Sequence, residues 1–262
     1  MPRVIRPTLF ALLVANLVVG CATPTLIQST SVPTQPAPIR PAPTPTQPEP
    51  IQPAPTQSAP TSTSTLGILG VQVSIPVGEG TETLNATITG NGDVAIIIAN
   101  SLGNDPSRWA PLVEALGSNA NLRIVTFAYR SDNEDTHVTD TIAVFDYLRA
   151  ERIGKIICIG AGFGSTACAG LQKKPEIIGM VFFATNASAI DANFPKLFLT
   201  ADADPFGLAG STERAYQQSA EPKIFKSYVA GVHGVALFSK ADVGPQVLAD
   251  VTEFINGIVS GQ

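Results

Sequence analysis

An apolar run that leads into three alternating glycines constrains the fold of this chain most strongly. Residues 155–159 read Lys-Ile-Ile-Cys-Ile, and Gly-Ala-Gly-Phe-Gly follows at 160–164. The β-branched side chains favour a strand, and the glycines allow a tight turn because they accept positive φ angles. The segment after the turn is compatible with a helix. A strand–turn–helix unit of this kind predicts a sheet whose parallel strands are connected by helices.

The same alternation of strands and helices extends over most of the chain after residue 66. Strands are expected at 71–76, 84–89, 94–99, 123–129, 155–159, 177–183, 195–200 and 223–229, and helices at 106–116, 138–152, 163–172, 208–219 and 245–259. Residues 94–99 are all apolar, as in a central strand buried on both faces. The predicted fold class is α/β, with a mostly parallel sheet, helices on both faces and an antiparallel edge formed by the first two strands. Propensity alone leaves a Rossmann-like sheet open.

The N-terminal residues have the features of a targeting segment. Arg3 and Arg6 precede an uncharged, mostly apolar stretch at 8–19. This stretch is shorter than the roughly 20 residues of a membrane span and typical of a signal peptide. Val-Val-Gly-Cys at 18–21 resembles the lipobox of bacterial lipoproteins, which implies cleavage before Cys21 and lipidation of its thiol. An ordinary secretory signal is the alternative. We expect residues 1–20 to be a lipoprotein signal peptide and Cys21 to anchor the protein in a membrane, facing the extracytoplasmic side of the cell envelope.

Composition divides the rest of the chain into a linker and one domain. Residues 21–65 are rich in Pro, Thr, Gln, Ser and Ala and contain too few large apolar side chains to offset the entropy of ordering. We expect a disordered spacer there and a single domain at 66–262. The formal net charge of −5 and the lack of a basic stripe argue against a nucleic-acid partner. No Cys/His spacing suggests a metal site, and no cofactor is expected.

Two cysteines lie within the predicted domain, one in a strand and one in the following helix. Cys158 and Cys168 can pair in an oxidising compartment or remain as buried free thiols. The sequence favours buried free thiols.

Three landmarks resemble the α/β-hydrolase family, and they follow the family's chain order of nucleophile, acid and histidine. The turn at 160–164 resembles the nucleophile elbow, which carries a serine in the family but Gly162 here. Leu-Thr-Ala-Asp-Ala-Asp-Pro at the end of a strand implies Asp204 as the acid, with Asp202 as the alternative. Gly-Val-His-Gly after the last strand implies His233 as the catalytic histidine. The small dienelactone-hydrolase-like and esterase-like members are the most similar.

The resemblance also implies an oxyanion region. The loop after the 94–99 strand, with Ser101 and Leu102, is expected to line the pocket, and the backbone amide of Phe163 is the second expected donor. A dinucleotide-binding fingerprint is the alternative explanation of the glycines, but that motif belongs to the first βαβ unit, whereas this turn follows at least four strands. The other histidine, His137, is expected in a polar loop, exposed to solvent.

Because position 162 is a glycine and not a serine, two functions have to be considered. Ser165 is the nearest hydroxyl along the chain, but in a helix it points away from position 162. The hypothesis favoured from sequence is therefore a non-hydrolytic module that binds an unidentified small molecule or protein at the membrane face. The alternative is an active hydrolase of esters or related small substrates, in which an Asp204–His233 dyad activates a water in the space left by the serine side chain.

Overall fold

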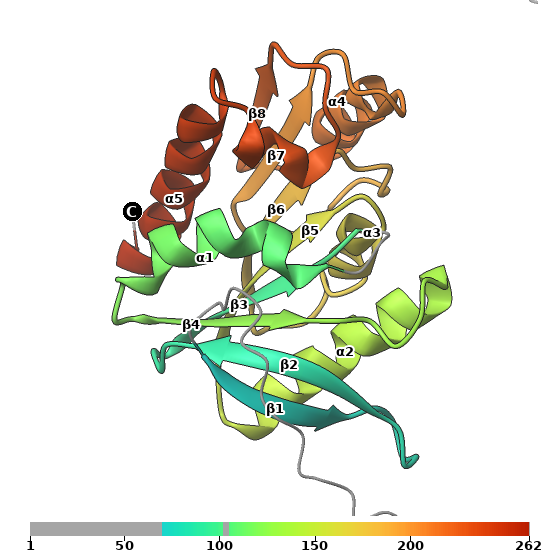
Figure 1. Cartoon of the computed structure of the whole chain (residues 1–262), viewed down its shortest axis with the longest axis vertical. Coiled ribbons are helices and arrows are strands. Elements are labelled where there is room, and N and C mark those ends of the chain that lie inside the picture. Colours follow the sequence, from blue (N-terminus) through green and yellow to red (C-terminus); the bar gives the residue numbers. More distant parts are fainter. Residues whose placement is uncertain (1–69, 102–104, 262) are drawn as a thin grey trace, which may run out of the picture. The chain divides into compact units, whose positions relative to one another are not determined.

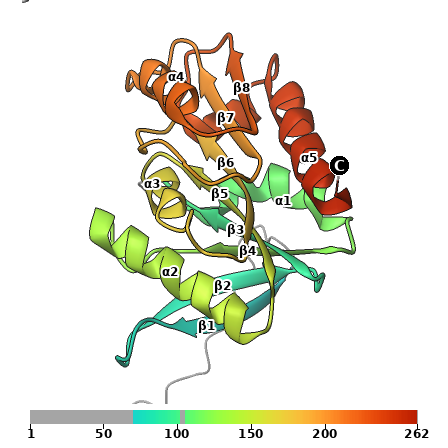
Figure 2. The same ribbon diagram turned by 180° about the vertical axis from the view of Figure 1, so that it is seen from behind.

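The computed structural model describes residues 70–101 and 105–261, and the predicted signal peptide, Cys21 and linker lie outside them. The described part forms one eight-stranded sheet covered by helices (Figures 1 and 2). The strands are β1 (Val71–Pro76), β2 (Thr83–Thr89), β3 (Val94–Ala99), β4 (Leu122–Phe127), β5 (Lys155–Ala161), β6 (Ile177–Phe183), β7 (Lys196–Ala201) and β8 (Lys223–Tyr228). Among the described residues, no helix combines the length and apolarity needed to cross a bilayer.

The sheet has the order β1-β2-β4-β3-β5-β6-β7-β8. β1 pairs with β2 and β2 pairs with β4 in antiparallel register, whereas all the other neighbours are parallel. The antiparallel edge and the mostly parallel sheet predicted from sequence are both confirmed. Because β3, β5, β7 and β8 run parallel, their carboxyl ends lie along the same edge of the sheet. The loops that follow these strands contain the residues of the candidate site.

Helices cover both faces of the sheet. They are η1 (Pro106–Trp109), α1 (Ala110–Gly117), α2 (Glu134–Ala150), α3 (Phe163–Ala169), α4 (Leu208–Gln218), η2 (Gly234–Ser239) and α5 (Gly244–Ser260), where η denotes a 3₁₀ helix. Figure 1 shows α1 and α5 on the near face, and Figure 2 shows α2, α3 and α4 on the opposite one.

Strand β3 joins the two apolar cores because its side chains alternate between the faces. Ala95 and Ile97 belong to the core under α2 and α3, while Ile96 and Ile98 belong to the core under α1 and α5. All six residues of β3 are buried, as the continuous apolar run predicts.

Helix α2 begins four residues earlier than predicted, and this places His137 in the interior. The Asn133 side chain caps the helix by accepting a hydrogen bond from the Asp135 amide at 2.9 Å, and acidic residues in the first turn complement the helix dipole. His137 therefore lies within α2, fully buried, and its ring stacks on that of Tyr129 with centroids 3.9 Å apart. The prediction that His137 is exposed in a polar loop is wrong.

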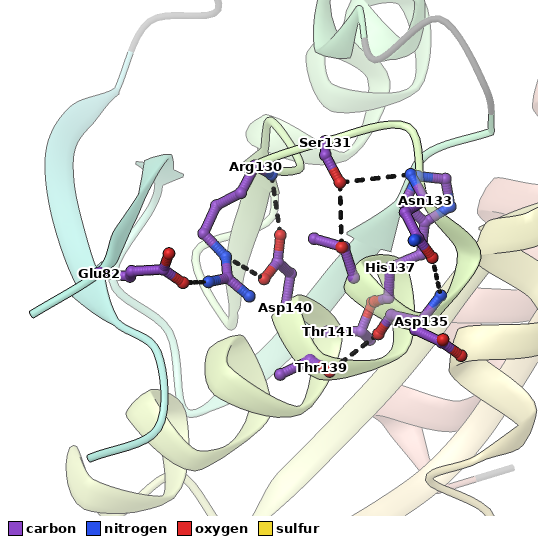
Figure 3. A network of polar contacts seen from close by, with 10 residues as sticks. Glu82, Arg130, Ser131, Asn133, Asp135, His137, Thr139, Asp140 and Thr141 are labelled. Carbon is purple, nitrogen blue, oxygen red and sulfur yellow. Dashed lines mark hydrogen bonds and ion pairs between the residues drawn. The ribbon is translucent and has the colours of Figure 1, made fainter. Parts of the chain in front are cut away.

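A polar network fixes the start of α2 against the β1–β2 hairpin (Figure 3). Asp140 is fully buried and accepts hydrogen bonds from the Arg130 backbone amide at 2.9 Å and from Arg130 Nε at 2.7 Å. Arg130 also forms an ion pair with Glu82, next to β2. Since a buried carboxylate is costly without such partners, this network holds the segment between β4 and α2 in one arrangement.

Cys158 and Cys168 form a disulfide, so the expectation of free thiols is wrong. The turn at 160–164 folds α3 back along β5 and brings the two Cα atoms to 5.6 Å, within the range that a disulfide bridges. Both residues are fully buried beneath the turn. The disulfide therefore links the strand and the helix that flank Gly162.

Candidate active site

The turn between β5 and α3 is the one that resembles a nucleophile elbow in sequence, and Gly162 stands at its centre. Gly162 has φ 52° and ψ −119°, a conformation that a residue with a Cβ adopts only under strain. A Cβ on Gly160 would overlap the backbone of Gly164, and a Cβ on Gly164 would overlap the backbone at the end of β3. The outer glycines are therefore required by close packing, whereas Gly162 supplies the positive φ.

Asp204 and His233 form the polar centre of the site. Asp204 follows β7, and its Oδ2 lies 2.8 Å from His233 Nδ1 in the loop after β8. Asp204 Oδ1 accepts a hydrogen bond from the Phe206 amide at 2.9 Å, and its side chain is fully buried. An ionised carboxylate only accepts hydrogen bonds. In the bond between Asp204 Oδ2 and the neutral ring of His233, the proton is therefore on Nδ1.

Asp202, the alternative acid, has a different task. Its Oδ1 accepts hydrogen bonds from the Ala203 amide at 2.8 Å and the Ala230 amide at 3.0 Å. These bonds tie the loop after β7 to the loop after β8. Asp202 thus stabilises the backbone of the two loops that contain Asp204 and His233. Its carboxylate makes no hydrogen bond to the His233 imidazole among the described contacts.

Ser101 lies closer to the elbow than sequence reasoning foresaw. A Cβ placed on Gly162 would lie 2.6 Å from Ser101 Oγ and 3.7 Å from His233 Nε2. The space beside Gly162, where a water was expected from the sequence, is therefore partly occupied by the hydroxyl of Ser101. Leu102, predicted beside Ser101 in the oxyanion region, lies outside the described residues.

These groups open into one pocket of about 410 Å³. Its lining consists of Ser101, Arg108, Gly162, Phe163, Asn186, Phe206, Leu208, His233, Gly234 and Val235. The ring of Phe206 stands edge-on to that of His233, with centroids 4.7 Å apart, although Phe206 itself is 72% exposed. The pocket combines apolar walls with a few polar groups, as small-molecule sites do.

The remaining predicted residues separate into two groups. Phe163 is the first residue of α3 and lines the pocket, as predicted, so its amide belongs to the helix end that faces the site. Ser165 is fully buried, and its hydroxyl has no partner among the described residues and does not line the pocket. Ser165 is therefore out of reach of a substrate. Within the described ranges, no three His, Cys, Asp or Glu side chains are grouped to hold a metal ion.

Comparisons with known proteins identify the fold. No protein-family model matches the sequence, and no curated protein matches it either. Among solved structures, the chain is similar to a thermophilic esterase from Thermogutta terrifontis, with a TM-score of 0.58, 12% identity and coverage of 72% of this chain and 99% of the esterase. It is also similar to the enol-lactonase from Burkholderia xenovorans, with a TM-score of 0.55, 16% identity and coverage of 66% and 96%. The esterase domain of a Rhodothermus marinus protein gives a TM-score of 0.58 at 15% identity, with coverage of 70% and 96%.

The chain therefore has the α/β-hydrolase fold that the three sequence landmarks predicted, and its structural neighbours include esterases and a lactonase. At these identities the likeness shows the fold alone. The activity has to be argued from the site.

Proposed function

We propose that the protein is a hydrolase of small carboxylic esters in which His233 is the general base. The observation that carries the proposal is the 2.8 Å hydrogen bond between Asp204 and His233, made inside a pocket with His233 Nε2 directed at the elbow. Nδ1 carries the proton, so Nε2 keeps its lone pair free to take a proton from an attacking hydroxyl or water. Of the two functions considered from sequence, this geometry favours the hydrolase.

The pocket suggests which esters fit. A volume of about 410 Å³ is near the lower end of ligand pockets, and the Phe163, Leu208 and Val235 side chains offer an apolar wall for a short acyl or alkyl group. Arg108 lines the same pocket and makes no ion pair within the described residues. A substrate that carries a carboxylate would find its counter-charge there, because a guanidinium matches a carboxylate in shape and charge.

We also propose that the domain works on the extracytoplasmic side of a membrane, anchored through Cys21. The lipobox-like sequence at 18–21 motivates this location. The Cys158–Cys168 disulfide supports it, because such bonds persist in oxidising compartments and are rare in the cytosol.

A non-catalytic binding module is the second candidate, and Gly162 is the feature that favours it. The pocket, its Arg108 and the helix end at Phe163 would bind a ligand whether or not it is turned over. The two candidates differ in one respect, since only the hydrolase needs the proton-accepting capacity of His233.

Turnover of short p-nitrophenyl esters by the full chain tests the proposal. His233→Gln and Asp204→Asn are expected to lower kcat/KM by about 100-fold or more, the first by removing the base and the second by favouring the wrong imidazole tautomer. Asp202→Asn is the matched control, because an asparagine keeps the Oδ1 acceptor for both backbone amides. Its activity should stay close to that of the parent.

Two results would contradict the hydrolase. The parent protein could leave every ester intact, or the His233→Gln variant could hydrolyse esters as fast as the parent. A ligand that co-purifies with an inert protein, identified by mass spectrometry, would favour the binding module.

A further inference from the structure

We propose that Ser101 is the nucleophile of this site, supplied by the loop after β3 in place of the elbow residue. The inference rests on the proposed hydrolase function and deepens it. Compared with a serine at the turn after β5, this arrangement keeps the Asp204–His233 pair as acid and base. The nucleophilic hydroxyl instead comes from the loop after β3.

The first argument is position. Ser101 Oγ lies 2.6 Å and His233 Nε2 lies 3.7 Å from the point where a Cβ of residue 162 would stand. The hydroxyl and the base therefore both border one small volume, the volume that a side chain on residue 162 would occupy. Ser101 makes no hydrogen bond to any described residue, so its hydroxyl can rotate between staggered positions to meet Nε2. Catalytic hydrogen bonds often close in this way only when substrate is bound.

The second argument is that the backbone before Ser101 is held firmly. Asn100 is buried, and its side-chain oxygen accepts a hydrogen bond from Trp109 Nε1. Trp109 is itself fully buried, and its ring packs against those of Phe183 and Phe238. On the other side, the Asn100 carbonyl lies against Gly164, where only a glycine fits. These contacts fix the Cα of the next residue relative to α3, as a nucleophile requires.

The third argument is that the other hydroxyls near the turn are unsuitable. Ser165 is fully buried, and Thr166 Oγ1 makes a hydrogen bond to Asn186 at 3.4 Å. Neither residue lines the pocket, whereas Ser101 does. Among the described residues that line it, Ser101 is the sole Ser, Thr, Cys, Lys or Tyr.

The reaction balances without a cofactor. Ser101 Oγ attacks the ester carbonyl carbon while its proton passes to His233 Nε2. The bond from that carbon to the alcohol oxygen then breaks, and the alcohol leaves with the proton from Nε2, so that an acyl-Ser101 ester remains. A water, deprotonated by His233, attacks this ester, the acid departs and Ser101 regains its proton. The imidazolium that forms in each half-reaction is stabilised by Asp204, at 2.8 Å from Nδ1.

Labelling of the full chain with a fluorophosphonate, followed by peptide mass spectrometry, tests the assignment directly. An activated Oγ displaces fluoride from phosphorus and keeps the phosphonyl group. We expect the adduct on Ser101 in the parent protein and no adduct in the Ser101→Ala or His233→Gln variants. Ser165→Ala is the matched control, since it removes a nearby hydroxyl that is buried and unpartnered, and it should be labelled like the parent. Circular dichroism and thermal melting establish that each variant is folded.

Turnover of p-nitrophenyl acetate, measured on the same variants, separates the two proposals. Loss of labelling and at least about a 100-fold loss of kcat/KM in Ser101→Ala support both. Turnover that depends on His233 but persists in Ser101→Ala overturns the assignment of Ser101 and leaves the hydrolase standing with water as nucleophile. Labelling of Ser101 in a protein that hydrolyses no ester supports the nucleophile and overturns the ester substrate. A parent protein that is not labelled at Ser101 overturns the assignment in every case.

Discussion

Restoring a serine at position 162 tests whether Ser101 fills the place of the missing side chain. Gly162→Ser forces a residue with a Cβ into φ 52°, which costs about 1–3 kcal/mol. It also brings the new Cβ to 2.6 Å from Ser101 Oγ, a contact that one of the two side chains must relieve. In the Ser101→Ala background the nearest atom of residue 101 is its Cβ, at 3.4 Å. The strain at φ remains there, but the overlap with the hydroxyl disappears.

The two substitutions are therefore expected to be coupled. Gly162→Ser should lower the free energy of unfolding by about 1 kcal/mol more in the parent than in Ser101→Ala, as a double-mutant cycle in urea measures. Gly162→Ala, tested in both backgrounds, should show the same coupling because it carries the same Cβ. Additive effects would refute the reasoning, since they would mean that Ser101 does not occupy the space beside Gly162.

The same double variant has a functional readout. Gly162→Ser with Ser101→Ala moves the hydroxyl to the elbow, with its Cβ 3.7 Å from His233 Nε2. A fluorophosphonate should then label position 162, whereas Gly162→Ala with Ser101→Ala should stay unlabelled. A folded double variant without a label at position 162 would mean that His233 does not activate a hydroxyl there.

Three further outcomes follow from the structure. Replacing Cys158 and Cys168 together by Ala should lower the free energy of unfolding by about 3 kcal/mol, because the unfolded chain is then no longer restricted by the disulfide, and urea titration with and without reductant checks this. Burial lowers the pKa of His137 below its usual 6.5, so at acid pH the unfolded chain binds a proton that the folded protein does not. The free energy of unfolding should therefore fall as the pH drops below about 6.5, by up to about 1.4 kcal/mol per pH unit. Chemical denaturation at several pH values should show a weaker pH dependence in His137→Gln. Arg108→Gln should raise KM for esters that carry a carboxylate and leave KM for neutral esters unchanged, which steady-state kinetics on a matched ester pair decides.

The fold class was accessible from the alternation of strands and helices along the sequence, and the acid–histidine pair was implied by the resemblance to the α/β-hydrolase family. The β3 run is apolar throughout because both faces of that strand are covered, and Asp204 and His233 each follow a strand end in the loops that meet at one edge of the sheet. β7 and β8 are parallel neighbours in the sheet, so the loops that follow them start side by side. The resemblance to the α/β-hydrolase family implied Asp204 as the acid, with Asp202 as the alternative, and Asp204 is the residue whose carboxylate lies 2.8 Å from His233 Nδ1.

Of the features that sequence reasoning missed, one depends on packing between distant segments and two had local signals. Ser101 reaches the elbow because Asn100, the residue after β3, packs on Gly164 in α3, and no local pattern encodes this contact. The disulfide had a readable signal, since Cys158 in the predicted strand and Cys168 in the following predicted helix lie only ten positions apart in the sequence. His137 also had one, because Asn133 followed by two acidic residues marks a helix start and therefore puts His137 in a helix instead of a loop.

The central claim is a hydrolase whose nucleophile is Ser101, and trapping the acyl-enzyme tests it most directly. The full chain is mixed with p-nitrophenyl acetate, quenched with acid before the steady state and digested for mass spectrometry. We predict an acetyl group on the peptide that contains Ser101, present at early times and absent from the His233→Gln variant. Turnover with no acetyl group at Ser101, or with the group on another residue, would contradict the account.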